Sequence, residues 1–183
     1  MGEKSDCREI SCGNTKVTET ERKLVGLSCR TKLMDACIDG NLGLTQRRLD
    51  SGADVNSQTV SGMCALIYAV EGNYPEIVSL LLRSYANVNV KDYLNLTPLM
   101  YAVCRRAINM VKILLDAGAD VNSRDTSNTT ALIYAIRFGT VDIVRALVDA
   151  GADVATKDKS DKTTLMHARD RGNTEIVRLL ENS

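Results

Sequence analysis

Residues 118–151 read GADVNSRDTSNTTALIYAIRFGTVDIVRALVDAG, and this pattern recurs along most of the chain at a fixed period of 33 residues. A leucine marks the same point of each repeat: Leu33, Leu66, Leu99, Leu132 and Leu165. The third residue after each of these leucines is always an alanine. Self-similarity at a fixed period is typical of repeat proteins, in which each unit buries its apolar face only against its neighbours. We therefore predict a stack of similar units.

Within the quoted unit, the order of polar, apolar and turn residues predicts two helices. Residues 125–128 contain Asp, Ser and Asn, which favour a turn. Thr130 is a good N-cap for the short apolar helix that follows, and Gly139 can end that helix in the left-handed conformation. Apolar residues at spacings of three and four predict a second helix over 141–150, which Gly151 ends in the same way.

This order of turn, short helix, reversal and longer helix resembles the ankyrin repeat. Residues 97–99 (TPL) are close to the TPLH sequence of that family, residues 118–122 (GADVN) match its closing phrase, and residues 143–144 (IV) match its second helix. The resemblance covers about residues 31–183. It implies an all-α fold, an ankyrin-repeat solenoid of stacked helix-turn-helix units with short β-turn fingers. It also implies a concave face of inner helices and fingers that binds other proteins.

The repeat pattern divides the chain into a tail and one domain. We expect a polar N-terminal tail over residues 1–28, in which residues 19–28 form a candidate capping helix. The ankyrin-repeat domain then occupies residues 29–183. Its repeats span about residues 29–60, 61–93, 94–126, 127–159 and 160–183.

Two departures from the family pattern predict local differences. Apolar residues replace the histidine of TPLH throughout, so we expect apolar packing in place of its hydrogen-bond network: Met34, Ile67, Met100, Ile133 and Met166. Asn73, Tyr85 and Arg106 stand where the reversal glycines are expected. A left-handed Tyr or Arg costs about 1 kcal/mol or more. We therefore expect repeats 2 and 3 to be the softest, or their helix ends to adopt another geometry.

Composition excludes several classes of function. Lys plus Arg and Asp plus Glu both number 23, so zero formal charge provides no general attraction to nucleic acid or to an anionic membrane. No apolar run approaches the roughly 20 residues that span a bilayer. Six cysteines without a CxxC spacing and a single histidine predict neither a metal site nor a cofactor. We expect a monomeric cytoplasmic protein, with the nucleus or delivery into a host cytosol as alternatives.

No catalytic motif is evident, and we expect no enzyme activity. The sequence lacks a glycine-rich phosphate loop, a serine elbow and a paired-carboxylate motif. His167 stands at the same repeat position as Tyr68, Tyr101 and Tyr134, which indicates a structural role such as packing or a finger contact. We expect the tyrosine rings to pack on neighbouring repeats, with their hydroxyl groups near the concave surface.

We expect partner-binding residues at repeat positions whose side chains the fold does not need. Five apolar residues in the first two finger turns form what we call the apolar finger cluster: Val60, Met63, Tyr93, Leu94 and Leu96. Exposed apolar groups often mark an interface, and aromatic residues dominate interface energetics. The cluster is interpreted either as a binding hot spot or as packing between neighbouring fingers.

A second candidate surface is cationic. The basic strip comprises Arg105, Arg106, Arg137, Phe138 and Arg171 and continues into the finger residue Arg124. It is either a solvated charged face or a binding surface for an acidic peptide or helix, because the planar guanidinium group bonds carboxylates in pairs.

Together these patterns predict a non-catalytic protein-protein interaction module, an adaptor or inhibitor whose concave face and finger tips bind a protein partner with an acidic segment. The alternative is a delivered effector or targeting subunit that recruits an enzyme to its substrate.

Overall fold

The computed structural model describes residues 30–138 and 140–182, and every regular element in these ranges is a helix. The predicted tail, its candidate capping helix and Gly139 lie outside the described residues. The helices are α3 (Lys32–Ile38), α4 (Leu42–Asp50), α5 (Ala65–Glu71), α6 (Pro75–Arg83), α7 (Pro98–Cys104), α8 (Ile108–Asp116), α9 (Ala131–Phe138), α10 (Val141–Asp149), α11 (Thr164–Asp170) and α12 (Thr174–Glu181).

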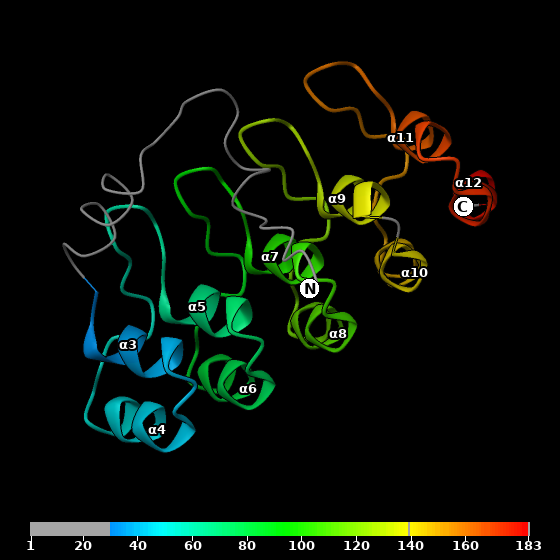
Figure 1. The fold of residues 1–183 in the computed structure, drawn as a ribbon. Helices are drawn as coiled ribbons and strands as arrows, with labels where there is room; N and C mark the ends of the chain where they lie inside the picture. The colour runs from blue at the N-terminus through cyan, green and yellow to red at the C-terminus, as the bar shows by residue number, and fades with distance from the viewer. Residues whose placement is uncertain (1–29, 139, 183) are drawn as a thin grey trace, which may run out of the picture.

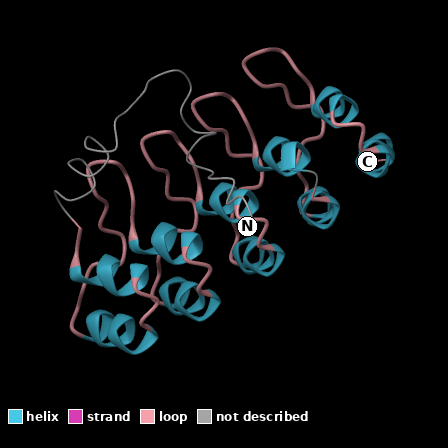
Figure 2. Ribbon diagram, in the orientation of Figure 1, coloured by secondary structure: helices cyan, strands magenta, loops and turns pink. Residues whose placement is uncertain are grey.

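The helices form two parallel rows (Figure 1). The inner row consists of α3, α5, α7, α9 and α11, which pack successively on one another. The helix that follows each of them along the chain belongs to the outer row, which consists of α4, α6, α8, α10 and α12. Long loops extend from the inner row, and no strand is drawn among the described residues (Figure 2). We call them fingers 1 to 4: residues 58–64, 91–97, 124–130 and 157–163. This arrangement confirms the all-α repeat solenoid.

The inner helix α9 begins directly after Thr130, the N-cap that the sequence predicts, and α7 begins in the same way after Thr97. The Thr97 side chain accepts a hydrogen bond from the Met100 N–H at 3.3 Å, and Pro98 occupies the first turn of α7. Thr130 accepts from the Ile133 N–H at 3.4 Å. Such a cap contributes about 1 kcal/mol because it satisfies a backbone N–H that has no partner within the helix.

The helix reversals keep the left-handed geometry even where glycine is absent. Gly40 and Gly172 have φ of 66° and 65°, while Asn73, Arg106 and Tyr85 have φ of 56°, 55° and 64°. The alternative of a different helix-end geometry is therefore wrong. The conformational strain falls in repeats 2 and 3, and their lower local stability remains a prediction.

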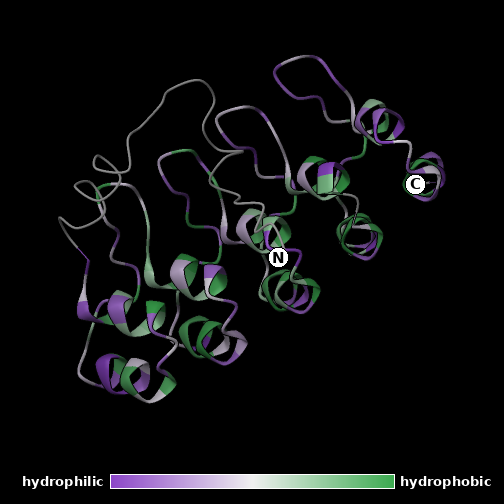
Figure 3. Ribbon diagram, in the orientation of Figure 1, coloured by the Kyte–Doolittle hydropathy of each residue, from purple (hydrophilic) through white to green (hydrophobic). Residues whose placement is uncertain are grey.

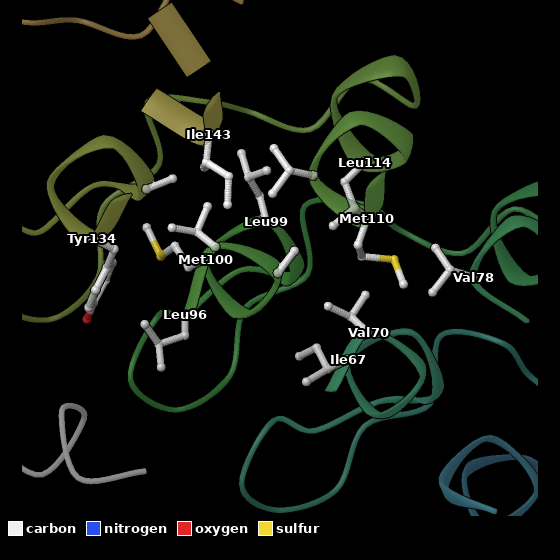
Figure 4. Close-up of a cluster of buried hydrophobic side chains, with 14 of the residues drawn as sticks. Ile67, Val70, Val78, Leu96, Leu99, Met100, Met110, Leu114, Tyr134 and Ile143 are labelled. Atoms are coloured by element: carbon white, nitrogen blue, oxygen red, sulfur yellow. The ribbon is translucent and has the colours of Figure 1, made fainter. Parts of the chain in front are cut away.

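Burial confirms the repeat period in the core. Leu33, Leu66, Leu99 and Leu132 are at most 1% exposed, whereas Leu165 is half-buried. Side chains from neighbouring repeats interlock around Leu99 (Figure 4), and the helices are most hydrophobic where they face one another (Figure 3). In the described part of the chain, none of the helices has the length and apolar character that crossing a membrane requires.

Backbone hydrogen bonds join the fingers into a continuous row. Tyr93 N–H donates to the Ser61 carbonyl at 3.0 Å, and Thr126 N–H donates to the Leu94 carbonyl at 2.9 Å. Lys159 N–H donates to the carbonyl of Ser127 at 3.1 Å. The fingers are therefore held in register, so that equivalent residues of successive fingers lie side by side.

Candidate protein-interaction surface

A buried aspartate holds finger 2 against its inner helix. Asp92 is 5% exposed, and one of its carboxylate oxygens accepts hydrogen bonds from the N–H groups of Leu94 and Leu96 at 2.9 and 2.7 Å. Its other oxygen accepts from the Tyr101 hydroxyl at 2.8 Å. One carboxylate therefore closes the finger turn and attaches it to α7.

The same anchor recurs in the next two fingers. The Tyr134 hydroxyl donates to Asp125 at 2.6 Å, and His167 Nε2 lies 2.9 Å from an Asp158 carboxylate oxygen. His167 thus makes a finger contact, as its repeat position indicates. The hydroxyl groups of Tyr101 and Tyr134 are tied to the fingers in the same way. At the position of the TPLH histidine, the predicted apolar packing is found in the first four repeats, where the residue is at most 1% exposed, but not for Met166, which is 51% exposed. The signal in the sequence was an aspartate nine residues before each of Tyr101, Tyr134 and His167, at steps of 33.

Burial sets the protonation of the anchor in finger 2. It raises the pKa of the Tyr101 hydroxyl well above its ordinary value, and the charge of Asp92 raises it further. Tyr101 therefore remains a hydrogen-bond donor across the physiological range. Burial also raises the pKa of Asp92, against the opposing effect of the hydrogen bonds from Tyr101 and the finger backbone.

In finger 4 the pKa of the anchoring aspartate shifts in the opposite direction. Burial alone would raise the pKa of Asp158, but the backbone N–H of Ser160 and the His167 side chain lower it, as does the N–H of Lys162. The net effect is a lowered pKa for Asp158, so the carboxylate of this anchor is stabilised in its charged form.

The apolar finger cluster divides into exposed and packed members. Val60 and Tyr93 are 77% and 64% exposed, and they occupy equivalent positions of fingers 1 and 2. Met63 and Leu94 are half-buried against the core. Leu96 is only 7% exposed and lies among the core side chains, so its prediction as a partner-binding residue is wrong (Figure 4). The finger turn directs Leu96 back toward the inner helices.

A close backbone approach fixes the two exposed apolar residues side by side. Gly62 has φ of 77°, and a Cβ atom there would lie 2.6 Å from Asp92 Cα. Only glycine leaves room for the backbone of finger 2 at this distance. The Tyr93 N–H bond to finger 1 adds to the contact. Val60 and Tyr93 therefore form a preorganised apolar ridge.

The arginines of the basic strip are exposed at or near the ends of the inner helices. Arg105 Nη2 lies 3.7 Å from a Glu71 carboxylate oxygen in the preceding repeat. Arg137 and Arg171 are exposed and form no ion pair with another described residue. Arg124, at the start of finger 3, is also exposed. Arg137 and Arg171 thus carry positive charge that no carboxylate of the described chain neutralises by a direct contact, whereas Arg105 is partly neutralised by Glu71.

Phe138 lies within this strip and is half-buried. Its ring stacks on Tyr134, with centroids 6.5 Å apart and an interplanar angle of 13°. The guanidinium carbon of Arg106 lies 5.6 Å from the centroid of the Phe138 ring, within the range of a cation-π interaction. An aromatic residue and a cation thus occupy adjacent repeats at the same surface.

The outer helices carry an open cavity of about 710 Å³ between α4 and α6. Leu42, Pro75 and Leu80 contribute its apolar wall, and Gln46, Glu76 and Arg83 are among its polar residues. Among residues 30–138 and 140–182, no three His, Cys, Asp or Glu side chains are grouped so that they could hold a metal ion. The cavity holds no nucleophile paired with a base, so the finger and inner-helix surface remains the candidate site.

Stacked two-helix units with a projecting row of fingers define a repeat protein of the solenoid class. Such a protein recognises its partners with a long surface rather than with an enclosed pocket. The family model of ankyrin repeats (3 copies) matches residues 33–125 and 122–183, and the chain belongs to this family. Ankyrin repeats are generally protein-protein interaction modules. No curated protein matches the chain closely enough to be counted as a relative.

Proposed function

We propose that this protein is a non-catalytic adaptor or inhibitor that binds a protein partner with its finger tips and inner-helix surface. The observation that carries the proposal is the apolar ridge of Val60 and Tyr93, which is exposed yet rigidly positioned. Exposed apolar groups at a turn add little to the stability of the fold, so they point to binding. A preorganised aromatic side chain favours binding because less conformational entropy is lost when the partner binds.

The basic strip adds a second feature of the partner. Arg105, Arg137 and Arg171 follow one another along repeats 3 to 5, beyond the apolar ridge on fingers 1 and 2. A partner segment that covers both surfaces would place an apolar group on the ridge and acidic side chains on the strip. The charge pattern supports an acidic segment because exposed arginines such as Arg137 and Arg171, which form no ion pair with another described residue, bind carboxylates by charge-assisted hydrogen bonds.

We also propose that the protein acts in the cytoplasm. Cys37 and Cys64 are buried and are free thiols in the structure. Burial raises the pKa of the Cys37 thiol to about 11, which keeps it protonated and unreactive. Unpaired structural cysteines fit a reducing compartment.

The charge of the basic strip is tested by reversing it. We expect the double variant Arg105→Glu, Arg137→Glu to lose a partner that the wild-type protein captures from a lysate of its own cells. Quantitative mass spectrometry of the captured proteins measures this loss. The matched control reverses Arg145 and Arg178, two exposed arginines of α10 and α12, and so changes the net charge equally. Equal capture by both double variants would exclude the strip as the binding surface.

The apolar ridge is tested by Tyr93→Ala. We expect this substitution to weaken binding of the captured partner by more than about 1 kcal/mol, because it removes an aromatic anchor. Thermal stability should change little, since the side chain is 64% exposed. Isothermal titration calorimetry and a melting curve give the two quantities.

The control is Tyr85→Ala, which removes a tyrosine that is 90% exposed at the end of α6. Its affinity should equal that of the wild type. Leu94→Ala is less suitable because Leu94 packs against the core, so stability would change together with binding. A Tyr93 variant with wild-type affinity would remove the ridge from the interface.

A further inference from the structure

Arg106 occupies a backbone position that favours glycine. Its φ is 55°, and the equivalent residues of repeats 1 and 5 are Gly40 and Gly172, with φ of 66° and 65°. The Arg106 side chain is exposed and forms no hydrogen bond or ion pair with another described residue. The repeat fold requires the left-handed reversal but not an arginine at this position, which is a reason to look for a function of the side chain.

A series of contacts fixes where the Arg106 guanidinium lies. Asp125 in finger 3 accepts the hydroxyl hydrogen bond of Tyr134, which is 4% exposed. Tyr134 stacks on Phe138, and Phe138 lies under the guanidinium carbon of Arg106 at 5.6 Å from the ring centroid. The cation is thus positioned by the neighbouring repeat, although it is exposed to solvent.

The cation-π contact leaves the hydrogen-bonding capacity of Arg106 unused. A guanidinium has five N–H donors around its edge in a planar fork that matches the two oxygens of a carboxylate. Phe138 contacts the guanidinium without accepting these hydrogen bonds. Arg137, exposed at the end of the same inner helix as Phe138, and Arg105 add positive charge nearby.

We propose that Arg106, held by Phe138, binds the carboxylate of an aspartate or glutamate side chain in the partner segment. The inference rests on the proposed function and names the group that recognises the acidic residue. Phe138 is the positioning residue, because it restrains the guanidinium before the partner arrives and so reduces the entropy lost on binding. A nucleic acid is the weaker alternative, since the Phe138 ring already contacts Tyr134 and Arg106.

The test is a nuclear magnetic resonance titration of the ¹⁵N-labelled full chain with a capped dodecapeptide of alternating Glu and Ala. We expect the Nε–H signal of Arg106 to shift, and that of Arg145 on α10 to stay. Arg106→Gly should weaken the peptide about tenfold, the effect of one charge-assisted hydrogen-bonded pair, without lowering the melting temperature. Phe138→Leu should weaken it by a smaller factor, and Arg145→Ala should leave the affinity unchanged.

Three results would overturn the inference: no shift of Arg106 at millimolar peptide, equal affinity of Arg106→Gly and wild type, or equal binding of the matching Gln and Ala peptide. Tighter binding of a single-stranded dodecanucleotide would assign the cation to nucleic acid instead. If Tyr93→Ala and the charge reversal abolish partner capture while Arg106→Gly leaves peptide binding intact, the proposed function holds and only this inference fails. If neither Tyr93→Ala nor the charge reversal affects partner capture, the proposed function itself fails.

Discussion

Replacing Leu99 with alanine is expected to lower the free energy of unfolding by about 2–5 kcal/mol. Leu99 is 1% exposed in α7, and side chains from α8 and α10, including Met110 and Ile143, lie around it (Figure 4). The substitution removes buried apolar surface and leaves a cavity that the fixed helix spacing cannot close. Because every repeat is stabilised only by its neighbours, a cavity in the third of five units weakens contacts on both sides.

Leu165→Ala is the matched control for this prediction. Leu165 occupies the same repeat position in α11, but it is half-buried because α11 packs mainly on the inner helix α9 and is the last inner helix of the described chain. Its loss should therefore be clearly smaller. Urea unfolding followed by circular dichroism gives both values. Equal losses, or a Leu99 variant within about 0.5 kcal/mol of wild type, would contradict a core divided among the repeats.

The repeat period made the fold predictable because it fixes which residues are equivalent. Once Leu99 is a core position, Leu33, Leu66 and Leu132 must be core positions too, and the structure buries all of them. The left-handed conformations of Asn73 and Arg106 were one of the two outcomes that the sequence left open, and they occur because neighbouring repeats impose the same reversal.

The fingers were harder to predict because a hairpin turn reverses direction within a few residues. Tyr93 and Leu96 are three residues apart, yet one is exposed and the other belongs to the core. No simple hydrophobic period distinguishes them. The cation-π contact between Arg106 and Phe138 was equally hidden, because it joins two repeats through a side-chain direction that depends on the left-handed backbone.

The aspartate anchors explain how polar fingers remain rigid, and they provide the second large prediction. Asp92→Ala is expected to lower the free energy of unfolding by about 2–4 kcal/mol, because the N–H groups of Leu94 and Leu96 and the Tyr101 hydroxyl lose their acceptor at a buried site. Asp54→Ala is the control. Asp54 accepts hydrogen bonds from the Asn56 N–H and the Ser57 hydroxyl at 3.0 Å, but it is exposed, so water can replace it. Its loss should stay below about 1 kcal/mol.

Asp92→Asn separates the hydrogen bonds of this anchor from its charge. An Asn oxygen can still accept the two backbone hydrogen bonds, so the loss should be smaller than in Asp92→Ala. Burial raises the folded-state pKa of Asp92 above its unfolded value, so the folded state binds the proton more tightly. The wild type therefore loses stability relative to Asp92→Asn as pH rises from the ordinary pKa of an aspartate through the raised folded-state pKa of Asp92. Urea unfolding at several pH values measures the difference. A difference that moves in the opposite direction would mean that the hydrogen bonds to the Asp92 carboxylate outweigh the cost of burying its charge.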